Sequence, residues 1–292
     1  MSLTARANAK INLSLDVLGK REDGYHIVEM IMQSVSLHDT VTVSKENDGE
    51  IRIICGSSEV PEDDSNIAAR AARAFFETAN IQNPGITVRI KKRIPVAAGL
   101  AGGSADGAAV IVLLNELFGT GFSDEELADI GEKVGADLPF CVTGGTMLAR
   151  GTGGLLTPLP PMPDCYIVIS KPEMGISTAA AYAKIDSAEL NCRPDTEKLS
   201  EAICARELGE VAEGLCNVFE SALDDEQWKT VAEIKRIMLK NGALGACMSG
   251  SGPSVFGIFD DKADASDCAD ELEELHAQTY VCRPENTGIE IV

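Results

Sequence analysis

Aromatic residues, histidines and long apolar runs are scarce in this sequence. Only 4% of its 292 residues are Phe, Trp or Tyr, and three are His. The nine cysteines are odd in number and scattered, without a C-x-x-C pair, which argues against both a disulfide framework and a zinc site. No apolar stretch approaches the ~20 residues that cross a bilayer, and the first residues lack the features of a secretory leader. These absences predict a cytoplasmic protein with reduced thiols and no membrane partner.

Positive charge is scarce as well. The chain has 25 Lys and Arg residues against 46 Asp and Glu residues, a formal net charge of −21. Proteins that hold nucleic acid neutralise its phosphates with clustered Lys and Arg, so we expect no nucleic-acid partner. Acidic residues are densest from Asp260 to Glu274, where Leu272 and Leu275 interrupt them at helical spacing. This spacing favours a solvated helix face.

The first half of the chain carries clear patterns for strands and helices. Residues 7–16 alternate apolar and polar side chains, which predicts a half-buried strand with Lys10 on its polar face. Residues 40–55 predict two strands joined as a hairpin at an Asn-Asp-Gly turn. Residues 66–78 predict a helix, and residues 85–95 predict a strand that ends at a proline.

A proline-rich segment separates this half from the rest. Before it, Ser123 and Glu126 form the pattern of a capping box. Residues 158–164 contain four prolines and can scarcely be helix or central strand, so we place a domain boundary there, between residues 1–157 and 158–292. The order of strands, helices and further strands without regular alternation predicts an α+β protein of two domains.

A glycine-rich stretch, IPVAAGLAGGSADGAAVIVLLNEL, runs from Ile94 to Leu117 between a strand and a helix. It lacks the lysine of a Walker A loop and the G-x-G-x-x-G of a dinucleotide fingerprint. Glycines before a helix that starts near Ser104 would let several N–H groups point at one anion, which the positive helix end also favours. A tight strand-to-helix turn explains the glycines equally well, so the loop alone leaves both interpretations open.

The complete string around these glycines, Pro95-x-x-x-Gly-Leu-x-Gly-Gly-Ser-Ala, resembles the second motif of the GHMP kinases. Residues 5–26, ARANAKINLSLDVLGKREDGYH, resemble the amino-terminal motif of the branch that phosphorylates 4-diphosphocytidyl-2-C-methyl-D-erythritol. Residues 135–159 also resemble that branch, and residues 245–259, GACMSGSGPSVFGIF, are similar to the third motif of the superfamily. The resemblance implies an amino-terminal ATP domain like domain 2 of ribosomal protein S5 and a ferredoxin-like carboxy-terminal domain.

The resemblance also implies roles for matched residues. The implied catalytic pair is Lys10 and Asp137. The implied ATP-binding residues are Asn66, Pro95, Ala97, Ala98, Gly99, Leu100, Ala101, Gly102, Gly103 and Ser104. The implied acceptor-binding residues are Asn12, Tyr25, His26, Tyr182, Gly250, Ser251 and Gly252. Simpler explanations stay open: a solvated face for Lys10, a helix N-cap for Asp137 and Asn66, core packing for Tyr182, and a glycine turn before a strand for residues 250–252.

The implied reaction is phosphorylation of the 2-hydroxyl of 4-diphosphocytidyl-2-C-methyl-D-erythritol by ATP in the non-mevalonate isoprenoid pathway. Mg²⁺ is expected with ATP, but Asp106 could face either way and its ligands stay open. Two alternatives remain: another GHMP kinase, such as a homoserine kinase, or a sensor that keeps the fold without catalysis. The oligomeric state is not predicted.

Overall fold

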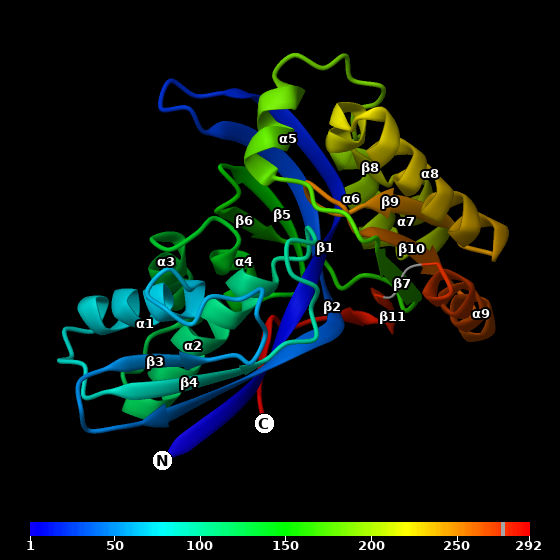
Figure 1. The fold of residues 1–292 in the computed structure, drawn as a ribbon. Helices are drawn as coiled ribbons and strands as arrows, with labels where there is room; N and C mark the ends of the chain where they lie inside the picture. Colours follow the sequence, from blue (N-terminus) through cyan, green and yellow to red (C-terminus); the bar gives the residue numbers. More distant parts are fainter. Residues whose placement is uncertain (276–277) are drawn as a thin grey trace.

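The first lobe is built around a long antiparallel hairpin of strands β1 (Ser2–Lys20) and β2 (His26–Lys45). The computed structural model describes residues 1–275 and 278–292, and the hairpin runs the length of the molecule (Figure 1). The sheet around it has the order β13-β1-β2-β4-β3, and further short strands pair with its members. These are β5 (Thr146–Gly151), β6 (Leu155–Pro158), β8 (Cys216–Asn217) and β12 (Pro284–Glu285).

The hairpin predicted over residues 40–55 is wrong in its pairing. Its second strand, β3 (Ile51–Ile54), pairs in parallel with β4 (Ile86–Lys91), and β4 pairs with β2. Helix α1 (Ile67–Thr78) connects β3 to β4, which is the crossover that a parallel pair requires. Turn residues and alternation predict strands, but they do not say which strand is inserted between two neighbours.

Helices cover one face of this sheet. Helices α1, α2 (Gly102–Phe118) and α4 (Leu138–Thr143) pack on the strands, and α3 (Asp124–Glu132) packs against these helices. The predicted helix over residues 66–78 is confirmed as α1. The predicted capping box at the start of α3 is also confirmed, with both of its reciprocal hydrogen bonds present.

The polar face of β1 is buried, so the prediction of a half-buried strand is wrong. Asn8, Lys10 and Asn12 are 7%, 4% and 0% exposed. Segments that follow residue 157 contact this strand, since β8 pairs in parallel with β1 and the backbone N–H of Asn12 donates to Ser249 Oγ at 3.3 Å. Polar side chains buried at a contact between lobes mark the place where a site is to be sought.

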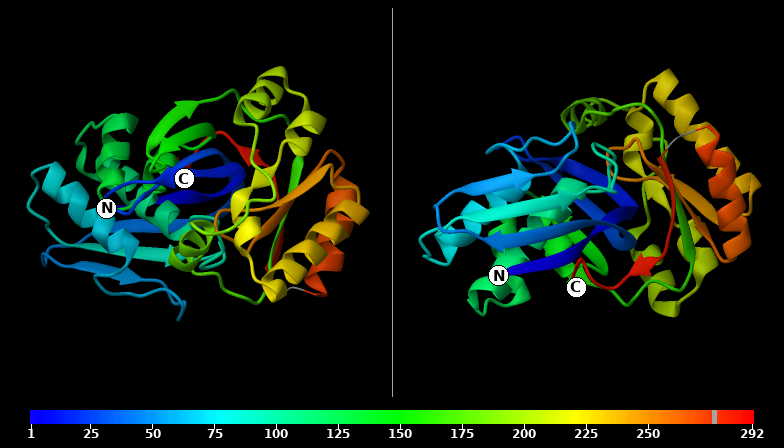
Figure 2. Two further views of the ribbon diagram at one scale, coloured as in Figure 1. Left: turned by 90° about the horizontal axis from the view of Figure 1, so that it is seen from above. Right: turned by 60° about the horizontal axis from the view of Figure 1, so that its bottom comes forward.

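The second lobe has a four-stranded antiparallel sheet of order β11-β7-β10-β9. Its strands are β7 (Tyr166–Lys171), β9 (Gly245–Met248), β10 (Val255–Phe259) and β11 (Gln278–Cys282). Its helices are α5 (Thr178–Ile185), α6 (Thr196–Ala205), α7 (Leu208–Glu213), α8 (Asp225–Lys240) and α9 (Lys262–Glu273). Helices α8 and α9 lie on the outer face of the sheet (Figure 2). The succession of strand, helices, two strands, helix and strand is ferredoxin-like, so the predicted α+β class is confirmed.

The chain returns to the first lobe at its carboxyl end. Strand β12 pairs with β2, and β13 (Ile289–Ile291) pairs with β1. The last strands therefore belong to the first sheet, while the expected boundary between residues 157 and 158 stays a prediction. No helix among the described residues is long and apolar enough to cross a membrane.

Candidate functional site

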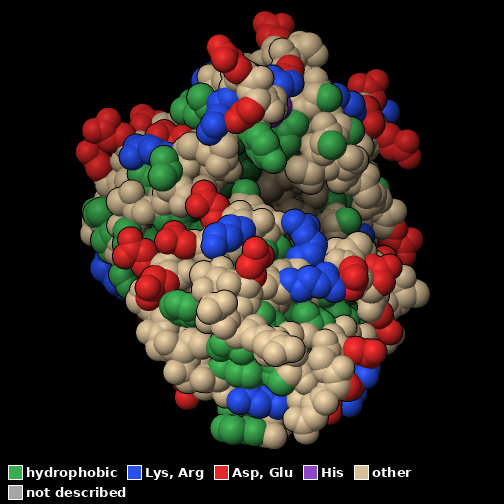
Figure 3. Space-filling view, turned by 90° about the vertical axis from the view of Figure 1, so that its left-hand side faces the viewer, with side chains coloured by type: hydrophobic (Ala, Val, Ile, Leu, Met, Phe, Trp, Pro, Cys, Tyr) green, Lys and Arg blue, Asp and Glu red, His purple; other side chains and the backbone are tan. Residues whose placement is uncertain are grey.

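A pocket of about 800 Å³ lies where the two lobes meet. Figure 3 shows the hollow, with Lys and Arg side chains on its rim and a few acidic side chains beside them. Most of the predicted site residues line it. They are Lys10, Asn66, Pro95, Ala97, Ala98, Gly99, Ala101, Gly102, Gly103, Ser104, Asp137, Tyr182, Gly250, Ser251 and Gly252. Predicted residues outside its lining are Asn12, Tyr25, His26 and Leu100.

The glycine loop enters α2 without a side-chain cap. The N-cap residue, Ala101, has a left-handed backbone (φ 56°) and makes no capping hydrogen bond. The first N–H groups of a helix have no partner within the helix, so those of Gly102, Gly103 and Ser104 are free to bind an anion. Ala97 is left-handed as well, with φ 51°. Backbone strain of this kind, at residues other than glycine, is typical of functional loops.

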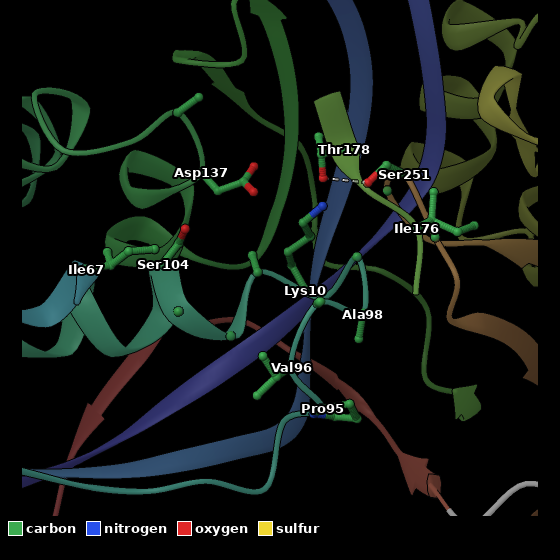
Figure 4. A pocket seen from close by; sticks show the side chains of 18 of the residues that line it. Lys10, Ile67, Pro95, Val96, Ala98, Ser104, Asp137, Ile176, Thr178 and Ser251 are labelled. Atoms are coloured by element: carbon green, nitrogen blue, oxygen red, sulfur yellow. Dashed lines mark hydrogen bonds between the residues drawn. The ribbon is translucent and has the colours of Figure 1, made fainter. Parts of the chain in front are cut away.

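The side chain of Lys10, from β1, and that of Asp137, from the start of α4, both point into the pocket. Figure 4 shows the Lys10 ammonium between Asp137 and Ser104 on one side and Thr178 and Ser251 on the other. The Lys10 Nζ donates to Asn12 Oδ1 at 2.6 Å. Asn12 therefore acts behind the pocket wall by orienting the lysine.

Asp137 occupies the N-cap position of α4, but its side chain makes no capping hydrogen bond. Helix capping therefore explains why Asp137 stands at this position in the chain, but it does not explain why a carboxylate is present there. The carboxylate is directed into the pocket instead (Figure 4). Asn66 behaves differently, because its Oδ1 accepts from the Ala68 N–H at 2.8 Å as an N-cap and its Nδ2 donates to the Pro61 carbonyl at 2.6 Å. Its capping role is confirmed.

A buried charge cluster beneath the glycine loop was not predicted. Lys92 Nζ donates to Asp106 Oδ2 at 2.7 Å and also to Asp39 Oδ2. Asp39 Oδ1 accepts the backbone N–H of Ile94 at 2.9 Å, which holds the start of the loop. Sequence patterns give no signal for this cluster, because its three members lie far apart along the chain.

The two carboxylates of this cluster share one lysine. Burial raises the pKa of Asp106 to about 8, and the charge of Lys92 opposes that rise. Burial also acts to lower the pKa of Lys92, but the two carboxylates outweigh it and the net change is upward. Lys92 therefore stays charged beneath the loop, where it is paired with the two aspartates.

Three rings, those of His26, Tyr182 and Phe219, form a group between the hairpin and α5. The His26 ring stacks on Tyr182 with centroids 4.6 Å apart, and Phe219 meets Tyr182 edge-on at 4.9 Å. His26 Nε2 bonds to Asp186 Oδ1 at 2.6 Å, which ties the hairpin to the end of α5. Burial raises the pKa of Tyr182 to about 12, so its hydroxyl keeps its proton. Tyr25 is 67% exposed at the hairpin tip and lies outside the pocket lining.

The second glycine turn closes the pocket from the other lobe. Ser251 Oγ and Thr178 Oγ1 are hydrogen-bonded at 2.9 Å, as the dashed line in Figure 4 marks. The Asn217 side chain holds this turn by donating to the carbonyls of Met248 and Gly250 at 2.7 and 2.8 Å. Leu100 acts from behind the first loop, since its carbonyl accepts the Lys10 N–H at 3.1 Å.

The pocket offers few carboxylates for a metal ion. Within residues 1–275 and 278–292, no group of three or more His, Cys, Asp or Glu side chains could hold one. Asp106 is turned toward Lys92 and is buried. Mg²⁺ commonly keeps several waters and uses one or two protein groups beside substrate phosphates. The Ser104 hydroxyl and the Asp137 carboxylate fit that requirement.

Family models match both lobes of this chain. The model of the GHMP kinases N terminal domain matches residues 66–145, and that of the GHMP kinases C terminal region matches residues 199–278. A homoserine kinase from Cytophaga hutchinsonii has a similar structure, with a TM-score of 0.80 at 20% identity over 100% of this chain and 97% of that one, which is a likeness of fold. The chain belongs to the GHMP kinases.

Closer relatives define the branch. A 4-diphosphocytidyl-2-C-methyl-D-erythritol kinase of Acetivibrio thermocellus is 48% identical over 96% of this chain and 98% of its own length. One of Clostridioides difficile is 42% identical over 98% of this chain and 96% of its own length. A crystal structure of 4-(cytidine 5'-diphospho)-2C-methyl-D-erythritol kinase superposes with a TM-score of 0.80 at 29% identity, covering 96% and 98% of the two chains. The chain therefore belongs to the 4-diphosphocytidyl-2-C-methyl-D-erythritol kinases, which confirms the resemblance.

Proposed function

We propose that this chain transfers a phosphoryl group from ATP to the 2-hydroxyl of 4-diphosphocytidyl-2-C-methyl-D-erythritol, giving the 2-phosphate and ADP in the non-mevalonate isoprenoid pathway. One observation carries the proposal. Lys10 and the uncapped carboxylate of Asp137 face one pocket with a glycine loop whose helix lacks a side-chain cap. Phosphoryl transfer asks a protein mainly to position its reactants and to stabilise charge, and this arrangement supplies both. The proposed location is the cytoplasm.

In the proposed reaction, Lys10 and Asp137 have different roles, and the glycine loop binds ATP. The free N–H groups of Gly102, Gly103 and Ser104 bind phosphate oxygens of ATP, and Lys10 stabilises charge on the group in transfer. Asp137 orients the acceptor hydroxyl and accepts its proton, for which its carboxylate is free of capping bonds. If Mg²⁺ binds with ATP, it would supply further charge neutralisation, and Ser104 and Asp137 would be the residues that hold it. Because the acceptor is a hindered tertiary alcohol, orientation counts for more than base strength.

The cytidine end binds beside Tyr182. The His26 ring already covers one face of Tyr182, so the base cannot lie between these two rings at a centroid separation of 4.6 Å. We propose that the base uses the pocket side of Tyr182 and that Tyr25 closes over it from the hairpin. Stacking of this kind is independent of charge. Tyr25→Ala is expected to raise KM for the cytidyl substrate with little change in KM for ATP, as initial-rate kinetics would measure.

ADP release from Mg-ATP with four acceptors tests the reaction. We expect turnover with 4-diphosphocytidyl-2-C-methyl-D-erythritol and none with homoserine, mevalonate or galactose. If an acceptor without cytidine turned over faster, the assignment as a kinase would stand, but the assignment of a cytidine-binding pocket would be wrong. Ligand binding with no ADP release from any acceptor would favour a sensor.

Asp137→Ala tests the catalytic assignment. We expect kcat to fall roughly 100- to 10,000-fold, the usual contribution of a positioned acid or base, while ATP binding stays close to that of the parent. Rapid-quench kinetics and a nucleotide-binding titration measure the two effects separately. Near-normal kcat in this variant would show that the assignment is wrong.

A further inference from the structure

Two cysteines that are 24 positions apart in the sequence meet beside the lobe contact. Cys192 Sγ and Cys216 Sγ are 2.7 Å apart, and both are free thiols. Cys192 is exposed on the segment that follows α5, whereas Cys216 is half-buried in β8. A disulfide bond is about 2.05 Å long, so the two sulfurs are within about 0.7 Å of bonding distance.

Each sulfur is held by contacts of its own segment. Beside Cys192, Arg193 Nη1 donates to Asp16 Oδ1 of β1 at 2.7 Å. On the other side, the Asn191 N–H donates to Ser221 Oγ at 3.0 Å. Cys216 is fixed because β8 pairs with β1, where it lies opposite Ser14. The thiols are thus brought together by the fold on both sides.

We propose that Cys192 and Cys216 form a reversible disulfide by exchange with a low-molecular-weight disulfide. The thiolate of Cys192 attacks one sulfur of the small disulfide, forming a mixed disulfide and releasing one small thiolate. Cys216 then gives its proton to solvent and attacks the Cys192 sulfur, releasing the second small thiolate. In total, two protein thiols are oxidised, and one small disulfide is reduced to two thiols after protonation.

The exposure of the two residues sets this order. Cys192 is open to an incoming small molecule, whereas burial and the neighbouring Cys192 raise the pKa of Cys216. Cys216 therefore acts second. Only a small fraction of it is thiolate, but it lies next to the mixed disulfide on Cys192, and this proximity offsets the low fraction. Disulfides in reducing compartments are commonly transient and redox-sensing, which suits a pair reachable from solvent on one side only.

The bond would couple two parts of the site. The residue after Cys216 is Asn217, whose side chain holds the second glycine turn. The segment that carries Cys192 begins at Asp186, which binds Lys20 Nζ at 2.8 Å and the His26 ring. A disulfide would tie this segment to β8 and β1. Because it closes a loop in the unfolded chain, it should also raise the melting temperature.

Oxidised glutathione is the probe for the test, applied to the full chain under anaerobic conditions. We expect intact-mass spectrometry to show the loss of two hydrogen atoms, and non-reducing peptide mapping to join the peptides of Cys192 and Cys216. Dithiothreitol should restore the starting mass and lower the melting temperature again. A stable glutathione adduct on Cys192 in the parent chain, or a disulfide between other cysteines, would overturn the proposal.

Three variants sharpen this result. Cys216→Ser should stop at a glutathione adduct on Cys192, since the second thiol is missing. Cys192→Ser should give no disulfide involving Cys216. Cys204→Ser is the matched control, because Cys204 is also exposed, and it should form the disulfide as the parent does. If Cys216→Ser shows no adduct while remaining folded by circular dichroism, Cys192 is not the attacking thiol and the proposal fails.

Discussion

The two loops that face the pocket both contain glycines and a proline, but they lead into different structures. The first, residues 94–104, enters the 17-residue helix α2, whereas the second, residues 249–254, enters strand β10. Aligned peptide dipoles and free N–H groups occur at a helix start and not at a strand start. The first loop is therefore suited to bind phosphate, and the second is suited to close the pocket.

Direct contact between these loops explains why a glycine is needed at position 99, which phosphate binding alone does not explain. Ser249 Oγ donates to the Gly99 carbonyl at 2.9 Å, and the Ser254 N–H donates to the Ala98 carbonyl at 3.3 Å. A Cβ atom on Gly99 would overlap the carbonyl oxygen of Ser249. The comparison shows that a glycine in the first loop is required by the second.

Gly99→Ala should break this contact and has the largest expected effect among the glycine and serine variants. The new methyl group collides with backbone, and φ is 75°, where side chains are strained. We expect the free energy of unfolding to fall by about 2–4 kcal/mol, together with a loss of activity. Urea unfolding measures the first effect and ADP release the second.

Gly103→Ala is the matched control for the same loop. Its Cβ would meet only the flexible end of Ile67, at 3.1 Å, and we expect a cost below about 1 kcal/mol. If Gly99→Ala and Gly103→Ala lowered the free energy of unfolding equally, the contact between the loops would not be the reason that glycine is required at position 99.

Asp106→Asn tests the charge cluster, which lies under the first loop only. The folded pKa of Asp106 is raised to about 8, so between about pH 4 and 8 the native state holds a proton that the unfolded state has lost. This contribution to stability is complete below about pH 4 and is lost as pH rises through about 8. Asn should remove that decline, a change of up to about 1.4 kcal/mol per pH unit. Urea unfolding from pH 4 to 8 measures this change. If the free energy of unfolding fell equally with pH in the parent and in Asp106→Asn, the raised pKa of Asp106 would be contradicted.

Ser249→Ala should give a smaller effect than Gly99→Ala. It removes the bond to Gly99 and leaves the Asn12 N–H without its acceptor, at an expected cost of about 1–2 kcal/mol. Ser254→Ala is its control, because Ser254 Oγ is buried and has no hydrogen-bond partner among the described residues. Thermal unfolding should separate the two variants, and a larger loss at Ser254 would reverse the interpretation of the second loop.

Local chemistry made most elements predictable. The cap at Asn66 and the capping box before α3 depend on residues close together in the chain, and both are present in the structure. The glycine loop could be found in the same way, whereas Asp137 was singled out only by the resemblance to the GHMP kinases. That the Asp137 carboxylate is uncapped was not predictable, because a helix start is compatible with either orientation.

The sequence by itself determined most elements, the caps at Asn66 and Ser123, the glycine-rich loop before α2 and the residues that match the GHMP kinases. Only the tertiary structure decided that β4 lies between β2 and β3, that the polar face of β1 is buried, and that Lys92 bridges two distant aspartates. The physical reason is range. Propensity, capping and turn chemistry act over a few residues, whereas strand order, burial and shared charge depend on which distant segments pack together.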